Sequence, residues 1–338
     1  VALTRRYRIG RLLFNEAMRR LQGDYGSARG EGFYDREFGG GPLWQEMDRV
    51  RENLERHCSL LQEEGRLDEA VSCALSLADL SLAAGIPMGE VFREYRRLEN
   101  LVQSREGITL EDLFQQRARI LRDLAGEGGD ESVSSDRMDA GQVLLTGVSE
   151  AEGSVDFPLF LSEMRLLYLK GHYQRSMAAA IKCQPTGSAF RGSFHFPEYL
   201  LYEALLVYRL ARDSSSAARI SRAVRLGIAV RRMKKFSSLN PRQFQARYLL
   251  LKGLLYGLLG FFKRALICLE ASITEARAQG LIHDEALARE FAGEHLWRIS
   301  PLAAEPYLRS AEEAYARWGV VIKQSLSADG NSEHGERG

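Results

Sequence analysis

Hydrophobic residues recur at helical spacing through most of this chain, most clearly between residues 240 and 319. There, an apolar run over 248–259 contains Gly253 and stops at Gly260, and residues 261–278 carry apolar or small side chains at 3/4 spacing. Such a period is typical of a helix that buries one face in a core. The pattern predicts two antiparallel helices joined at Gly260.

This helix pair also carries a set of offsets between small and aromatic residues. A small residue, an aromatic, a glycine, a second aromatic and an alanine stand at Gly253, Tyr256, Gly260, Phe262 and Ala265. These offsets resemble those of a tetratricopeptide repeat. The small residues allow two helices to approach closely, and a glycine tolerates the positive φ common at a helix C-terminus.

Partial copies of the template occur elsewhere in the chain. The turn recurs at 65–70 and at 171–176, and a second helix pair is predicted over 285–318, with Ser300 as N-cap and Pro301 in the first helical position. Several copies in one chain favour an all-α, tetratricopeptide-like α-solenoid, in which antiparallel helix pairs stack into a superhelix. A generic helical bundle is the alternative, because any two amphipathic helices joined by glycine match part of the template.

A change of composition suggests how the chain is divided. Residues 126–156 hold eight acidic residues and one basic residue, with many Ser and Gly, which predicts a flexible linker. We expect an N-terminal helical-repeat lobe at 1–125, with a Gly-rich loop at 22–42, and a C-terminal lobe at 157–323. The polar tail, 324–338, is expected to be disordered.

Composition narrows the class of protein. The 338 residues are 45% hydrophobic and 27% charged, with eight prolines, which is typical of a core-forming helical protein. A net charge of +1 argues against nucleic acid as the main ligand. The four cysteines show no metal-ligand spacing and are expected to be buried in a reducing compartment. We expect a cytoplasmic protein, and the start at Val1 suggests a piece of something longer.

Catalytic motifs are not recognisable in the sequence. HExxH, GxSxG, the phosphate-binding GxxxxGK[ST] and a kinase-type catalytic loop are missing. Glu198, Glu203 and Glu290 lie in predicted helices, where salt bridges are the usual role of a carboxylate. We therefore expect no catalytic residue, no metal ligand and no cofactor.

One predicted helix, 217–235, is strongly basic. It contains seven cations and no acid. The residues are Arg219, Arg222, Arg225, Arg231, Arg232, Lys234 and Lys235. They could grip phosphates, but no aromatic residues are interleaved with them. A solvated face, held against the acidic linker or against another domain, is the favoured interpretation.

The C-terminal half resembles a known family. Its hallmark is approximately PENF, a helix, EALA, and then AxxYLxxAxxxYxxWGAxxK. The matching positions are Pro241, Phe244, Glu285 to Ala288, Tyr307, Leu308, Ala311, Tyr315, Trp318, Gly319 and Lys323. The pattern departs at Arg242-Gln243, where the acid and the Asn are absent, and at Val320.

This pattern is similar to the helical region of large multidomain signalling proteins. In those, a serine/threonine kinase-like domain and an AAA-type ATPase domain precede a tetratricopeptide-like superhelix, and GAF and histidine-kinase or cyclase modules often follow. The resemblance implies a linking or sensing role and carries over none of those activities.

The resulting functional prediction is a scaffold that binds a protein, a peptide or another domain of its own polypeptide in a concave groove. Candidate groove residues are Tyr202, Arg209, Tyr248 and Lys252. The alternatives are a superhelix that holds a small inducer, as in ATPase-type regulators, and a helical repeat that binds nucleic acid through 217–235. No membrane contact is expected.

Overall fold

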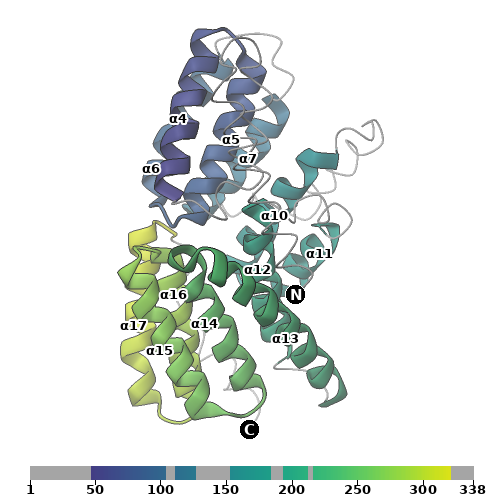
Figure 1. Ribbon diagram of the computed structural model, residues 1–338, viewed down its shortest axis with the longest axis vertical. Helices are drawn as coiled ribbons and strands as arrows, with labels where there is room; N and C mark the ends of the chain where they lie inside the picture. The colour runs from purple at the N-terminus through teal and green to yellow at the C-terminus, as the bar shows by residue number, and fades with distance from the viewer. Residues whose placement is uncertain (1–46, 104–110, 127–152, 184–192, 212–215, 321–338) are drawn as a thin grey trace.

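The computed structural model describes residues 47–103, 111–126, 153–183, 193–211 and 216–320, and these form helices and no strand (Figure 1). The helices are α4 (Met47–Glu63), α5 (Leu67–Ala83), α6 (Met88–Gln103), α7 (Glu111–Leu124), α10 (Gly153–Leu169), α11 (Tyr173–Cys183), α12 (His195–Ala211), α13 (Ser216–Leu239), α14 (Pro241–Leu258), α15 (Phe262–Ala278), α16 (Ile282–Trp297) and α17 (Pro301–Trp318). The predicted all-α class is confirmed. The predictions for the loop at 22–42, for 127–152 and for the tail after 320 lie outside the described residues.

The helices pack in neighbouring pairs, and glycine shapes the predicted turns. Gly65, Gly171 and Gly260 have φ values of 75°, 79° and 83°. They follow α4, α10 and α14, where each first helix of a pair ends. This left-handed region costs a residue with a Cβ atom more than it costs glycine. The three copies of the turn are therefore confirmed.

Small residues let the paired helices touch. A Cβ atom on Gly253 of α14 would lie 2.9 Å from Leu269 Cγ of α15. On α16, a Cβ atom on Gly293 would lie 2.6 Å from Leu308 Cδ2 of α17. Real Cβ contacts are longer than this, so glycine is what permits the close crossing of both pairs.

The ends of α17 match their predicted capping. The Ser300 hydroxyl oxygen accepts a hydrogen bond from the Ala303 N–H, and Pro301 is the first helical residue. Gly319 ends the helix with φ 86°, and Trp318 beside it is 1% exposed. Cap and terminator together satisfy backbone groups that a helix leaves free at its ends.

One helix begins earlier than expected. The flexible linker is predicted to run to residue 156, but this is wrong for its last four residues, because α10 begins at Gly153 and contains Pro158. A proline near the start of a helix removes one backbone hydrogen bond while most neighbouring bonds still form. The burial of Phe157, which is 0% exposed, accompanies this longer helix.

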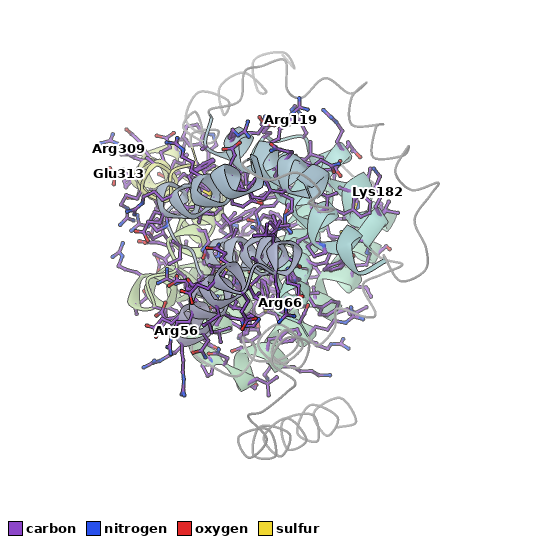
Figure 2. The ribbon with its side chains drawn as sticks, turned by 90° about the horizontal axis from the view of Figure 1, so that it is seen from above. Arg56, Arg66, Arg119, Lys182, Arg309 and Glu313 are labelled. Carbon is purple, nitrogen blue, oxygen red and sulfur yellow. The ribbon has the colours of Figure 1, made fainter. Side chains whose placement is uncertain are left out.

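Helices α4 to α7 gather at one end of the molecule, with α14 to α17 below them and α10 to α13 alongside (Figure 1). One hydrophobic cluster runs through these groups and includes Phe114 of α7, Leu205 of α12 and Leu250 of α14. The domain boundaries remain a prediction. Figure 2, seen from the α4–α5 end, shows charged side chains such as Arg119, Lys182 and Arg309 at the rim.

Two helices lie almost entirely inside. Fourteen of the 17 residues of α12 and 12 of the 16 residues of α16 are buried. A helix that is buried on every side has no face left for a ligand. The burial of α12 contradicts the prediction that its side chains line an accessible groove.

Candidate functional site

The predicted groove residues fall into two groups. Tyr202 and Arg209 of α12 are 1% and 7% exposed, so the groove prediction is wrong for these two side chains, which belong to the core. Tyr248 and Lys252 of α14 are partly exposed, and the Lys252 ammonium lies 5.7 Å from the centre of the Tyr248 ring. The structure does not bring the four together into one accessible groove.

Arg209 is instead paired with side chains inside the protein. Its guanidinium donates to Glu290 and Glu294 of α16 and lies 4.4 Å from the centre of the Phe291 ring. The Tyr315 hydroxyl of α17 donates to Glu290 from the other side. Arg209 thus ties α12 to α16, as a buried cation must be paired to be tolerated.

A second buried array crosses the first helices of the four C-terminal pairs. Arg165 of α10 donates to Glu198 of α12 over 3.1 Å, and Glu198 also pairs with Arg247 of α14. Arg247 then donates to Asp284 of α16 over 2.8 Å. We call these four residues the buried charge ladder. Each is at most 4% exposed.

Burial alone would lower the pKa of Arg247, but the carboxylates of Asp284 and Glu198 raise it above its ordinary value. The guanidinium is therefore firmly charged, and it also fixes a histidine. His283 Nε2 lies 2.7 Å from Arg247 Nη2, so the imidazole accepts and must be neutral on that nitrogen. Burial and the Arg247 charge lower the pKa of His283 to about 3.

The C-terminal end of α5 is docked on this ladder. Ala83 O accepts from Gln243 Nε2 over 3.0 Å and from Arg247 Nη2 over 2.9 Å. Just beyond, Gly85 has φ 77°, and a Cβ atom there would lie 2.5 Å from His283 Nδ1. The carbonyl that a helix end leaves free is satisfied in this way. The face on which α14 and α16 meet is consequently covered by the chain itself.

A third buried group joins the same regions. Asp79 of α5 accepts from Arg117 of α7, and its other oxygen lies 3.2 Å from His195 Nε2 of α12. Burial alone would raise the pKa of Asp79, but Arg117 and His195 lower it to about 2. The aspartate is an ionised anchor between three helices.

Several sequence predictions about polar residues can be checked here. Glu198, Glu203 and Glu290 each pair with an arginine, as expected for carboxylates on helices. All four cysteines are buried. Within the described residues, no three His, Cys, Asp or Glu side chains are grouped so as to hold a metal ion.

The basic helix α13 presents a different chemistry, because it is accessible. Arg219, Arg231, Arg232 and Lys234 are exposed, whereas Lys235 is half-buried. Arg222 is also half-buried and donates to Leu210 O at the end of α12. Arg225 is exposed too but pairs with Glu203, so five of the seven predicted cations are open to solvent.

The same helix carries an apolar row that sequence reasoning missed. Ile220, Val224 and Ile228 are 68%, 60% and 42% exposed. They stand four residues apart, so they form one line along the helix surface. The four-residue spacing of these three aliphatic residues is visible in the sequence. The sequence-based interpretation considered only the arginines around them. We call Ile220, Val224 and Ile228, together with the exposed cations Arg219, Arg231, Arg232 and Lys234, the α13 face.

A hollow of about 200 Å³ lies beside this face, between α12 and α13. Ala204 and Val207 of α12 and Ile228, Ala229 and Arg232 of α13 contribute to its lining. The lining mixes aliphatic side chains with the Glu203–Arg225 ion pair and with Arg232. The α13 face thus combines a row of hydrophobic side chains, a recess and positive charge.

Comparison with known proteins does not place the chain in a family: no protein-family model matches it, and no curated protein matches its sequence. Among the described helices, none has both the length and the apolar character needed to cross a bilayer. Among the described residues, the α13 face is the feature that bears most directly on function.

Proposed function

We propose that the chain is a non-catalytic interaction scaffold with tetratricopeptide-like helix pairs, serving as the partner-recognition and relay region of a multidomain signalling regulator. The recurring glycine turns and the close helix crossings at Gly253 and Gly293 support a repeat architecture. The charge ladder supports it too, since it links α10, α12, α14 and α16 in order.

The observation that carries the proposal is the α13 face. Three aliphatic side chains are 42% to 68% exposed in one line on a single helix. Isolated exposed hydrophobic residues are ordinary, but a contiguous row rimmed by polar groups is typical of a protein-binding surface. The partner is a protein or peptide, or another domain of the same polypeptide.

The alternative of a small-molecule sensor has less support. Hollows beside α4 to α6 and beside α12 and α13 measure about 230 and 200 Å³. Pockets that enclose a small ligand usually measure roughly 300–1,000 Å³. Both hollows suit a single inserted side chain better than a whole metabolite.

The test is a comparison of two surface variants of the full chain as baits in extract from the source cells. Val224→Asp places a charge in the apolar row, and Leu302→Asp places the same charge on α17, where Leu302 is 82% exposed. A partner retained by wild type and by Leu302→Asp but lost by Val224→Asp, at unchanged melting temperature, supports the proposal. Identical capture by all three baits, or no specific capture, contradicts it.

A further inference from the structure

The spacing of the α13 row matches one kind of binding element. Ile220, Val224 and Ile228 cover two intervals of four residues, a length of about 12 Å along a helix axis. Their side chains stand on one line, so a second helix with apolar residues at i, i+4 and i+7 could lie along it. An extended peptide would instead bind by pairing its backbone with unpaired backbone groups of the protein. A helix offers no such groups along its side.

The hollow extends this line at one end. Ile228 belongs both to the row and to the lining of the hollow, which also includes Ala204 and Val207 of α12 beside the Glu203–Arg225 ion pair. An apolar side chain inserted there would be desolvated on several sides. Buried anchors of this kind dominate the binding energy of helix-in-groove complexes.

The positive charge of the α13 face indicates which charge a partner should carry beside its apolar residues. Arg225 is committed to Glu203 over 3.0 Å, and Arg222 to Leu210 O. Among the described residues, the exposed Arg219, Arg231, Arg232 and Lys234 form no ion pair, and they lie toward the two ends of the helix. A partner with carboxylates beside its apolar row would be attracted, whereas a basic one would be repelled.

Nucleic acid fits this face less well than protein. Phosphate contacts explain the cations but leave three exposed aliphatic side chains unused, and stacking on bases needs aromatic residues. The row between the cations contains isoleucine and valine only.

We propose that the α13 face binds an amphipathic helix of a partner protein whose apolar stripe is flanked by acidic residues. The proposal rests on the function proposed above and gives it a partner class. Apolar residues of the bound helix pack on Ile220, Val224 and Ile228, one of them enters the hollow, and glutamates or aspartates approach Arg219, Arg231 and Arg232.

The probe is a fluorescein-labelled synthetic helical peptide of about 18 residues, long enough to span the row. It carries leucines on one stripe and glutamates beside them, and a control peptide carries lysines in place of the glutamates. Fluorescence anisotropy with the full chain is expected to give at least a ~10-fold tighter Kd for the acidic peptide. Raising the salt from about 50 to 300 mM should weaken that binding, because the charges are exposed.

Variants of the full chain complete the test. Val224→Asp and the double variant Arg231→Glu/Arg232→Glu should each weaken acidic-peptide binding by about 10-fold or more, and the double variant should flatten the salt dependence. Leu302→Asp should bind like wild type. Equal binding of the lysine and glutamate peptides, no binding of either, or unchanged affinity in the double variant would overturn the proposal.

Three other outcomes would assign the α13 face to a different occupant, and each would equally overturn the proposal. A wild-type dimer that Val224→Asp dissociates would assign the face to a second copy of the chain. Tighter peptide binding after deletion of residues 127–152 would assign it to that acidic stretch, and displacement of the peptide by a duplex oligonucleotide would assign it to nucleic acid. If the extract partner depends on Val224 while the acidic peptide does not bind, the proposed function stands and only the partner class fails.

Discussion

Acid should destabilise this protein through one buried histidine, His283. Its pKa is lowered from 6.5 to about 3 by burial and by the Arg247 guanidinium, which donates to Nε2. Asp284 Oδ1 lies 3.2 Å from the same nitrogen and would favour a charged ring, but burial and the arginine outweigh it. Since the folded pKa lies below the unfolded one, the unfolded chain binds the extra proton as the pH falls below 6.5.

The magnitude follows from the two pKa values. One pKa unit corresponds to about 1.4 kcal/mol, so the free energy of unfolding should fall by about 2 kcal/mol between pH 7 and pH 5, with a limit near 5 kcal/mol at pH 3. The window from pH 7 to pH 5 avoids Asp79, whose pKa is about 2 and whose contribution is lost only at lower pH. Burial also lowers the pKa values of His57 and His295, which add to the loss in this window, so the share of His283 is the part that vanishes with it.

The assay is urea denaturation followed by circular dichroism at pH 7, 6 and 5, at constant ionic strength. His283→Gln keeps an acceptor for Arg247 but cannot be protonated, so its stability should change less over this range than wild type by about 2 kcal/mol. Burial lowers the pKa of His172 in the α10–α11 turn as well, but this side chain is exposed, so the matched control His172→Gln should remove only a small part of the pH dependence. Parallel curves for wild type and His283→Gln would refute the reasoning.

Two further predictions concern stability, and both are measured by the same urea denaturation. Arg247→Met should cost about 3–5 kcal/mol, because it leaves the buried Asp284 without its arginine and Glu198 with Arg165 alone. Arg309→Met removes a surface pair on α17 and should cost under about 0.5 kcal/mol, so equal losses would contradict the buried ladder. Gly293→Ala should destabilise by about 1–3 kcal/mol, because the new Cβ would meet Leu308, whereas Gly227→Ala on α13 meets nothing within 4 Å and should stabilise by up to about 1 kcal/mol. A stabilising Gly293→Ala would show that the α16–α17 crossing is looser than described.

The helices and their turns were predictable from the sequence because both follow from local rules. Apolar residues at 3/4 spacing define a helix and its buried face, and a glycine at a fixed offset marks the left-handed residue that ends it. Gly65, Gly171 and Gly260 all take that conformation. The same local logic placed Ser300 at the N-cap of α17.

The groove could not be predicted correctly, because exposure is a property of the whole packing. Tyr202 and Arg209 have polar tips that suit a ligand-facing surface, yet α12 packs against α10, α11, α13 and α14 and is tied to α16 by Arg209. A signal was present in residues 197–210, which are strongly apolar on every side of the helix. Such a helix is expected in an interior, where a polar tip must find a partner within the protein.

The charge ladder was also beyond local reasoning. Arg165, Glu198, Arg247 and Asp284 are far apart in the sequence, and charges on helices usually face solvent. Only the stacking of the four first helices brings them together in alternating order. The pairing of Glu198 with an arginine was predicted, but its burial was not.

The interior position of the first helices moves the binding surface to the second helices. With α12 and α16 enclosed, the second helices other than α13 carry exposed large apolar side chains at Ile181 of α11, Phe262 and Ile267 of α15 and Leu302 of α17. Others are at Leu60 of α4 and in the turns, at Leu259, Phe261 and Ile299. Among the described residues, α13 is the second helix that carries three in line, and it carries the exposed cations as well. A single exposed side chain gives a partner little area to bury, whereas a row beside a recess gives both area and register. The α13 face is therefore the surface on which a partner could both bury apolar area and be held in one orientation.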